Sequence, residues 1–429
     1  MHYEKFQDGT VKCIEDEIPF EVPEGWAWAR LRDICMMSAG KSKSSDQIKS
    51  DPFQGSYPCF GGNGVRGYVD EYNQDGIFSI VGRQGALCGN INIAIGKFYA
   101  TEHAVVTTLF VGIDFKWSNY ILEALQLNNY ATGAAQPGLS VANILNVFVP
   151  VPPTQEQDRI GNNVDKSLKF IEALEQEKID LQKIIIAAKT KILDLAIRGK
   201  LVPQDPNDEP ASVLLERMRA EKEELIKQGK IKHDKKESVI FKGDDNSYYG
   251  IHLPDSWNWA SLREIALSIS DGSHNPPPNN GSDIPLLSAA NINDNSILMH
   301  EISRWITNEE WKIENQRTNI EVGDVLLTIV GSIGRSAVVQ NNNHFALQRS
   351  VAVIKPCLIN PLYLMHIVQS PQIQKWLTDN SKGTAQKGIY LNALSLMIIP
   401  IPPLEEQARI VERIHITYKQ LDLISNALL

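Results

Sequence analysis

The sequence has few of the features that mark membrane, secreted or metal-binding proteins. In 429 residues, no apolar run approaches the roughly 18 residues that a membrane-spanning helix needs. The N-terminal MHYEKFQDGT lacks the hydrophobic stretch of a secretory signal. The five cysteines are scattered and form no CxxC pair, which indicates reduced thiols and no zinc site. We therefore expect a globular, cytoplasmic protein without a metal.

Nucleotide-binding motifs are incomplete. Gly40-Lys41-Ser42 resembles the end of a phosphate-binding loop, but Cys35 stands where that loop needs its first glycine. GNGVRG (62–67) matches GxGxxG by letter, yet the residues after it favour turns rather than the helix that a dinucleotide site requires. We expect no bound nucleotide or other cofactor.

Catalytic motifs are equally weak. Asn275 and the three prolines after it resemble the tetrad of amino-methyltransferases, but the aromatic fourth residue is missing. Glu310 and Lys312 form a lone ExK, for which Asp283 and Asp294 are the available metal-sharing carboxylates. Such pairs arise by chance in an acidic chain, so the sequence indicates a protein with no catalytic residues, which is not an enzyme by itself.

The net charge of −9 is unevenly distributed. Residues 26–150 carry equal numbers of acidic and basic groups, and residues 257–403 are within one of balance. Because most of the acidity lies outside these two blocks, a local basic face for nucleic acid is compatible with the acidic total.

The most informative feature is an internal duplication. PEGWAWARLRDI (23–34) matches PDSWNWASLREI (254–265) at seven of twelve positions. GAAQPGLSVANILNVFVPVPPTQEQDRI (133–160) matches GTAQKGIYLNALSLMIIPIPPLEEQARI (383–410) at eleven of 28, and SIVG (79–82) is aligned with TIVG (328–331). The offset grows from 231 to 250, with the extra residues of the second copy mostly before Ile329. A repeat this long indicates duplication of a whole domain.

Each copy ends in a helical pattern. After a double proline, Thr154 to Gln157 reads as a capping box, and apolar residues then recur every three or four positions from Ile160 to Leu195. This predicts a long helix over 154–199 with a coiled-coil seam. LVPQDPNDEP (201–210) predicts a linker, 211–229 a second helix, and 404–429 a C-terminal helix with the same seam. We expect these helices to pack within the chain and to set the distance between the two copies.

The two copies share further motifs with a known family. In the first copy they are YPCFGGNG (57–64), GRQGALCG (82–89) and ATEHAVV (100–106). In the second copy they are DGSH (271–274), IPLLSAANI (284–292), GDVLLTIVGSIGR (323–335) and ALQRSVAVIKP (346–356), and AIRGKLVPQDPNDEPAS (196–212) lies between the copies. With PPxxEQ opening long helices, this pattern resembles the specificity subunit of type I restriction–modification enzymes, along nearly the whole chain.

The resemblance implies a mixed α/β (α+β) fold: two tandem strand-rich target-recognition domains joined by long helices that form an antiparallel coiled coil with pseudo-twofold character. The boundaries are an N-terminal segment (1–22), a first recognition domain (23–153), a central helical region (154–253), a second recognition domain (254–403) and a C-terminal helix (404–429). It also implies that each domain recognises one half of a bipartite, asymmetric sequence in double-stranded DNA. Two methyltransferase (modification) subunits would bind around the helices, and restriction (helicase–nuclease) subunits would join through them.

Base edges are contacted mostly by Arg, Lys, Asn and Gln, and phosphates by Lys, Ser and backbone N–H groups. Polar residues of these kinds in the predicted loops are therefore candidate DNA contacts. In the first copy they are Lys41, Lys43, Asn63, Arg66, Arg83, Gln84, His103 and Gln136; in the second they are Ser273, His274, Asn291, Ser332, Arg335, Gln348, Arg349, Gln386 and Lys387.

Two other hypotheses remain open from the sequence. One is a nuclease or methyltransferase that acts alone, which would show activity from the purified chain with metal or methyl donor. The other is a coiled-coil scaffold without DNA contact, which would show no salt-dependent DNA binding.

Overall fold

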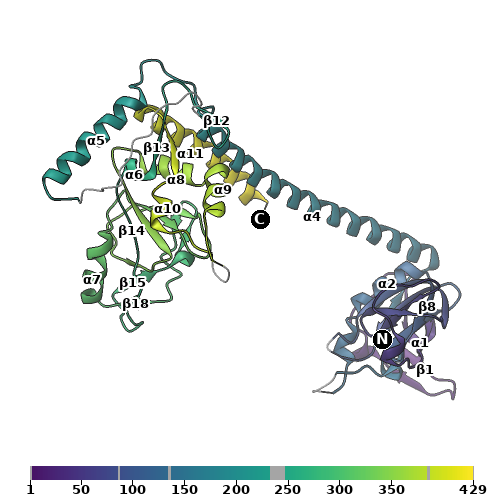
Figure 1. Ribbon diagram of the computed structural model, residues 1–429. Coiled ribbons are helices and arrows are strands. Elements are labelled where there is room, and N and C mark those ends of the chain that lie inside the picture. Colours follow the sequence, from purple (N-terminus) through teal and green to yellow (C-terminus); the bar gives the residue numbers. More distant parts are fainter. Residues whose placement is uncertain (1, 86, 134–136, 232–246, 384–386, 429) are drawn as a thin grey trace. The chain divides into compact units, whose positions relative to one another are not determined.

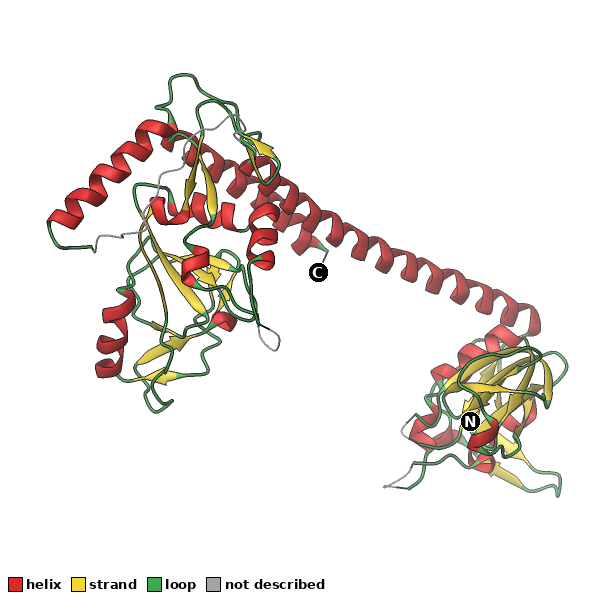
Figure 2. Ribbon diagram, in the orientation of Figure 1, coloured by secondary structure: helices red, strands yellow, loops and turns green. Residues whose placement is uncertain are grey.

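The computed structural model describes residues 2–85, 87–133, 137–231, 247–383 and 387–428. The chain divides into two compact units, Met1–Gln176 and Glu177–Leu429. Both units mix helices and strands, as the sequence predicted (Figure 2). Over the described ranges, no helix combines the length and hydropathy that crossing a membrane requires.

The first unit is built on a six-stranded sheet with the order β4-β9-β7-β8-β5-β6. Only the β5–β8 pair within this sheet is parallel. The strands are β4 (Cys35–Ala39), β5 (Tyr57–Gly61), β6 (Gly64–Val69), β7 (Gln74–Gly82), β8 (Ile91–Ala100) and β9 (Ala104–Leu109). Buried side chains such as Val81 and Val105 on one side, and Ile80 and Phe98 on the other, give the sheet apolar cores on both faces.

A separate pair of strands, outside the six-stranded sheet, also belongs to this unit. The strand β3 (Ala27–Arg30) pairs antiparallel with β10 (Phe148–Val151), so that Trp28 lies opposite Pro150. Three helices pack nearby: α1 (Leu31–Ile34), α2 (Phe115–Ala124) and α3 (Val141–Leu145). Trp28, the second tryptophan of WAW (26–28), therefore lies on a strand.

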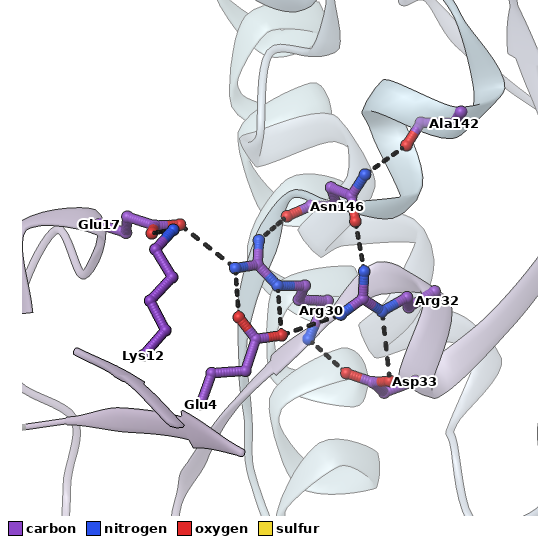
Figure 3. A network of polar contacts seen from close by, with 8 residues as sticks. All are labelled: Glu4, Lys12, Glu17, Arg30, Arg32, Asp33, Ala142 and Asn146. Atoms are coloured by element: carbon purple, nitrogen blue, oxygen red, sulfur yellow. Dashed lines mark hydrogen bonds and ion pairs between the residues drawn. The ribbon is translucent and has the colours of Figure 1, made fainter. Parts of the chain in front are cut away.

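An N-terminal hairpin is attached to this strand pair by ionic contacts (Figure 3). The hairpin consists of β1 (Tyr3–Lys5) and β2 (Val11–Cys13). Arg30 donates to both carboxylate oxygens of Glu4, at 2.8 and 2.6 Å, and Arg32 donates to Glu4 at 2.9 Å. The hydrogen bond from Arg30 is the main reason that the pKa of Glu4 lies below its ordinary value.

The second unit contains a four-stranded sheet, β14-β22-β19-β20, and a three-stranded one, β18-β15-β21. The strands are β14 (Ala266–Asp271), β15 (Ile284–Leu287), β18 (Trp305–Ile306), β19 (Val325–Thr328), β20 (Ser336–Val338), β21 (Ala346–Leu347) and β22 (Val351–Pro356). Three short pairs, β11 (Ser247–Tyr248) with β12 (Ile251–His252), β13 (Asn258–Ser261) with β23 (Ile398–Ile401), and β16 (Ile292–Asn293) with β17 (Ser296–Ile297), complete the strands. The short helices are α6 (Leu262–Ile265), α7 (Asn308–Thr318), α8 (Pro361–Val368), α9 (Pro371–Asp379) and α10 (Leu391–Leu394).

The long helices begin where the sequence predicted and end slightly earlier. They are α4 (Thr154–Ile197), α5 (Ala211–Lys227) and α11 (Leu404–Ala427). The predicted capping box at Thr154 is wrong: Thr154 is the first helical residue, and its hydroxyl donates to the carbonyl of Gly112 at 3.0 Å. The polypeptide before α4 is held at this point by a tertiary bond that the local sequence does not reveal.

Within the second unit, α11 runs antiparallel to the C-terminal part of α4 (Figure 1). Lys189 contacts Asp422 at 2.5 Å, and Tyr418 donates to the backbone carbonyl of Lys189 at 3.2 Å. Ile410 and Ile414 of α11 are fully buried in the same apolar cluster as the end of α4. Two helices with the same apolar period therefore do pack together inside this unit.

The duplication is visible in matching strand pairs and hydrogen bonds. Trp259 lies opposite Pro400 as Trp28 lies opposite Pro150. Gln157 accepts from the N–H of Asp114 and donates to the carbonyl of Pro152; Gln407 accepts from the N–H of Asn360 and donates to the carbonyl of Pro402. Each buried glutamine thus fastens the start of α4 or α11 to the helix that follows the last sheet strand.

The alignment of SIVG with TIVG is shifted by three residues relative to the backbone. Gly82 pairs with Ala104 in the first copy, and Thr328 pairs with the equivalent Val351 in the second. The residue that matches Gly331 is therefore Gly85, not Gly82. The strand residues here are buried on both faces, so apolar alternation does not specify the register.

Candidate nucleic-acid interface

Five of the candidate residues in the first copy converge at one end of the six-stranded sheet. Lys41 follows β4 and its N–H donates to the carbonyl of Ala100, while the N–H of Arg83, after β7, donates to the carbonyl of His103. The turn between β5 and β6 carries Asn63, and the adjacent Gly62 approaches the backbone of Gln84 and His103. These strand ends therefore bring Lys41, Asn63, Arg83, Gln84 and His103 together from four loops.

Their side chains differ in how far they are already engaged. Asn63 accepts a 2.7 Å hydrogen bond from Asn90, and the ring of His103 lies 3.5 Å from the carboxylate of Glu102. Within the described ranges, the side chains of Lys41, Arg83 and Gln84 have no hydrogen-bond or ion-pair partner and are exposed or half-exposed. As far as the described residues show, these three side chains are available to a ligand.

The remaining candidates of the first copy are placed differently. Lys43 forms a 2.7 Å ion pair with Glu71 and lies over the ring of Tyr99. Arg66, on β6, donates to the hydroxyl of Ser45 at 2.7 Å. Gln136 lies outside the described residues.

In the second copy, four candidates line one cleft of about 680 Å³. They are Ser273 and His274, which follow β14, and Gln348 and Arg349, which follow β21. The cleft continues along Lys382, Tyr390 and Asn392 on the far side. Since Arg349 and Lys382 supply positive charge and the other side chains supply donors and acceptors, the cleft has the chemistry of a nucleic-acid contact.

A buried carboxylate organises one wall of this cleft. Asp271 forms an ion pair with Arg317 and contacts the ring of His274 at 2.8 Å. Arg317 also donates to the backbone carbonyl of Asp271 at 3.0 Å, and Ser273 donates to Glu314 at 3.1 Å. Both Arg317 and Glu314 lie on α7, so this helix fixes the loop that carries Ser273 and His274.

The other candidates of the second copy lie on neighbouring loops or inside the fold. Ser332 and Arg335 are exposed in the loop between β19 and β20, where the N–H of Gly331 donates to the carbonyl of Lys387. Asn291 is buried: its amide accepts from the N–H of Ser288 and donates to the carbonyl of Glu301. Asn291 therefore stabilises its own turn and is not among the proposed DNA contacts. Gln386 lies outside the described residues.

Three weak motifs have structural explanations. A Cβ on Gly40 would lie 2.1 Å from the carbonyl oxygen of Ala100, so close backbone packing accounts for this glycine. GNGVRG spans the β5–β6 hairpin rather than a strand and a helix. Glu310 forms a reciprocal capping box with Thr307. Among the described residues, no cluster of three or more His, Cys, Asp or Glu side chains could hold a metal ion.

Four residues at these sites were not predicted from the sequence: Glu102, Arg317, Lys382 and Tyr390. Arg317 lies on α7, a helix between β18 and β19 that belongs to the extra residues of the second copy and has no counterpart between β6 and β7. The internal comparison therefore gave no signal for it. Glu102 was not found either, because ATEHAVV and ALQRSVAV, aligned from their first alanines, place Gln348 opposite Glu102, and only the backbone hydrogen bonds show that Arg349 is its equivalent.

Comparison with known proteins agrees with the duplicated architecture. The family model for the type I restriction modification DNA specificity domain matches residues 23–183 and again residues 254–428. The chain is 42% identical over 167 residues to the EcoprrI specificity subunit of Escherichia coli, covering 38% of this chain and 40% of that protein. It is 24% identical over 506 aligned positions to the EcoEI specificity subunit of Escherichia coli, covering 99% and 83%. The first of these matches therefore spans less than half the length of the relative.

Solved structures show the same fold. The crystal structure of the HsdS subunit from Thermoanaerobacter tengcongensis aligns with a TM-score of 0.56 at 18% identity, over 96% of this chain and 93% of that one. A chain from a structure that describes complex assembly and conformational transition of the type I R-M system aligns with a TM-score of 0.55 at 17% identity, over 96% and 94%. With two family matches over most of its length, each on one copy of the duplicated framework, the chain belongs to the type I restriction–modification DNA specificity family.

Proposed function

We propose that this chain is the DNA-recognition subunit of a type I restriction–modification complex and has no catalytic activity of its own. The first recognition domain (23–153) contacts one half of a bipartite, asymmetric site in double-stranded DNA, and the second (254–403) contacts the other half. The observation that carries the proposal is a strand framework built twice, whose outward loops carry different polar residues at equivalent backbone positions.

The contacting residues proposed are those that converge at the sheet ends. In the first domain these are Lys41, Asn63, Arg83, Gln84 and His103, with Lys43, Arg66 and Gln136 around them; in the second they are Ser273, His274, Gln348 and Arg349, with Ser332, Arg335, Gln386 and Lys387. Different residues at the two sites are what an asymmetric target requires.

The helices of the central region (154–253) and the C-terminal helix (404–429) form an antiparallel coiled coil in this proposal and set the spacing between the half-sites. A 44-residue helix such as α4 is about 66 Å long. Its middle exposes apolar side chains, among them Phe170 at 65% and Leu174 at 49%. Exposed apolar stripes mark protein contacts, and we assign this one to two methyltransferase subunits, through which restriction subunits join.

Exchange of residues 26–150 for the same segment of another family member is the decisive test. With the methyltransferase present, mapping of methylated adenines should show one half-site replaced and the other unchanged. A methylation pattern that is unaltered, or lost at both halves, would contradict separate recognition by the two domains.

Insertion of one heptad after Leu181 tests the role of the helix. The apolar seam keeps its phase over seven residues, so the complex should still assemble, and the non-specific spacer should lengthen. An unchanged spacer would exclude α4 as the element that sets it.

Activity assays separate this proposal from its alternatives. Cleavage or methylation by the purified chain alone, given Mg²⁺ or methyl donor, would favour a self-sufficient enzyme. Absence of salt-dependent DNA binding, even in the assembled complex, would favour a scaffold.

A further inference from the structure

The two recognition domains contain the same tight turn at the centre of the candidate interface. In the first domain the turn is 101–104, where the N–H of Ala104 donates to the carbonyl of Thr101 at 3.0 Å. In the second it is 348–351, where the N–H of Val351 donates to the carbonyl of Gln348 at 3.1 Å. The first turn joins β8 to β9, and the second joins β21 to β22.

Neighbouring backbone bonds hold the two turns in the same position. The N–H of Thr101 donates to Phe60 at the end of β5, and the N–H of Gln348 donates to Leu287 at the end of β15. The third turn residues, His103 and Ser350, accept from Arg83 and Ile329 after the next strand. Because the residues on both sides of the turn make the same backbone hydrogen bonds in the two domains, their second turn residues are equivalent. This residue is Glu102 in the first domain and Arg349 in the second.

These two equivalent residues carry opposite charges. Within the described residues, the guanidinium of Arg349 has no hydrogen-bond or ion-pair partner, and it faces the cleft with Ser273 and Gln348. The side chain of Glu102 is 36% exposed, and one of its carboxylate oxygens lies 3.5 Å from the ring of His103. The second carboxylate oxygen of Glu102 is covered and has no hydrogen-bond donor in the described part of the chain.

Base-edge chemistry distinguishes the two side chains. Arginine donates two hydrogen bonds to O6 and N7 of guanine, whereas a carboxylate only accepts and pairs with the exocyclic amino group of cytosine. Adenine also presents an amino donor in the major groove, while guanine offers only acceptors there. Near the DNA backbone a carboxylate is repelled by phosphates, so an acidic residue at this position needs such a donor.

We propose that Glu102 and Arg349 are specificity-determining residues at equivalent places of the two half-sites. Glu102 accepts a hydrogen bond from the exocyclic amino group of a cytosine or adenine, where Arg349 donates to a guanine. This inference rests on the proposed function, because it assumes that both turns face DNA, and it adds the class of base that each turn selects.

The test uses the chain assembled with its methyltransferase and compares Glu102→Gln, Glu102→Arg and Arg349→Glu by mapping methylated adenines. Glu102→Gln should reduce discrimination at one base pair of one half-site by about tenfold, the factor that corresponds to about 1.4 kcal/mol. Glu102→Arg should move the preference at that base pair to guanine, and Arg349→Glu should remove guanine from the other half-site. The base found in the wild-type motif distinguishes cytosine from adenine.

Asp75→Asn is the matched control, since it removes one negative charge at the far end of β7, about 23 Å of strand away from Gly82. It should leave the motif unchanged. An unaltered motif in both Glu102 variants, or uniform weakening on all sequences with a changed salt slope, would overturn the inference. Absence of any sequence-specific methylation by the wild-type complex would instead overturn the proposed function.

Discussion

The two copies use the same residues for their framework and different residues at their outward turns. Gly40 and Gly272 both lie where a Cβ would meet a backbone carbonyl at 2.1 Å, and Gln157 and Gln407 make the same pair of hydrogen bonds. The turns beside them carry Glu102 in one copy and Arg349 in the other. At these framework positions, identical residues have the same structural role in both copies, whereas the outward turns carry side chains of opposite charge.

The copies also differ in how they attach to α4. In the first copy, Lys116 and Tyr120 of α2 contact Asp165. In the second copy, Gln372 of α9 donates to Asp194 at 2.6 Å. Unrelated side chains thus attach each copy to α4. Substitutions of these side chains should therefore weaken the attachment of one copy at a time.

The largest effect is expected from the shared glycines. Gly40→Ala or Gly272→Ala should destabilise its own copy by at least about 3 kcal/mol, because the added Cβ would overlap a sheet carbonyl that cannot move freely. Hydrogen exchange resolved along the chain should show loss of protection in one copy only. Gly138→Ala, whose Cβ would make an ordinary 3.6 Å contact, is the control. Equal protection from exchange in the wild type and in both glycine variants would contradict the close approach of these glycines to the carbonyl oxygens.

Loss of the shared glutamines should rank next. Gln157→Ala and Gln407→Ala each remove two hydrogen bonds and leave a backbone N–H without its partner, which should cost about 2–4 kcal/mol. Similar losses of unfolding free energy in the two variants would confirm that the framework is truly duplicated. Gln155→Ala, at an exposed position near the start of α4, should have little effect. A large loss in only one copy would break the equivalence.

Attachment of the second copy to α4 should depend on pH through Asp194. Burial alone would raise the pKa of Asp194, but hydrogen bonds from Lys191, Arg198 and Gln372 outweigh it and lower the pKa to about 2. Because the pKa is lower in the folded state, the stabilisation is fully present above about pH 4 and is lost as the pH falls toward 2.

Asp194→Asn should therefore destabilise the second unit by about 2 kcal/mol at pH 7, since one pKa unit corresponds to about 1.4 kcal/mol. Denaturant unfolding at pH 7 and at pH 3 should show a smaller gap between variant and wild type at the lower pH. Asp255→Asn, at an exposed position, serves as the control. A gap that does not change with pH would contradict the ionised state of Asp194.

The smallest effect should come from the N-terminal hairpin, which is anchored to the first copy by the ion pair of Glu4 with Arg30. Arg30 is replaced at the equivalent strand position by Ser261, which caps α6. Glu4→Gln weakens the bidentate pair with Arg30 and should cost about 1 kcal/mol. Proteolysis of the hairpin should accelerate while the rest of the first unit stays protected; uniform destabilisation would show a wider role for Glu4.

Much of the candidate site could be predicted from the sequence, because a loop that joins two recognisable strands must lie at an end of the sheet. Lys41, Arg83, Gln84 and Arg349 lie at sheet ends for that reason. Asn291 could not be placed, since only the structure shows its amide used inside its own turn. Arg317 could not be found either, because its helix is an insertion whose position against Asp271 depends on tertiary packing.

The sequence by itself determined that a whole domain occurs twice and that long amphipathic helices follow each copy, because repeats and periodicity are local properties of the chain. Only the tertiary structure decided what identical residues do. Arg409 forms an ion pair with Asp208, whereas its counterpart Arg159 is exposed. Trp257 donates a hydrogen bond to the buried Glu406, whereas its counterpart Trp26 is only half-buried. Segment 201–210 packs against the second copy. A contact between residues 201 positions apart depends on how the chain folds back, and no local sequence pattern encodes it.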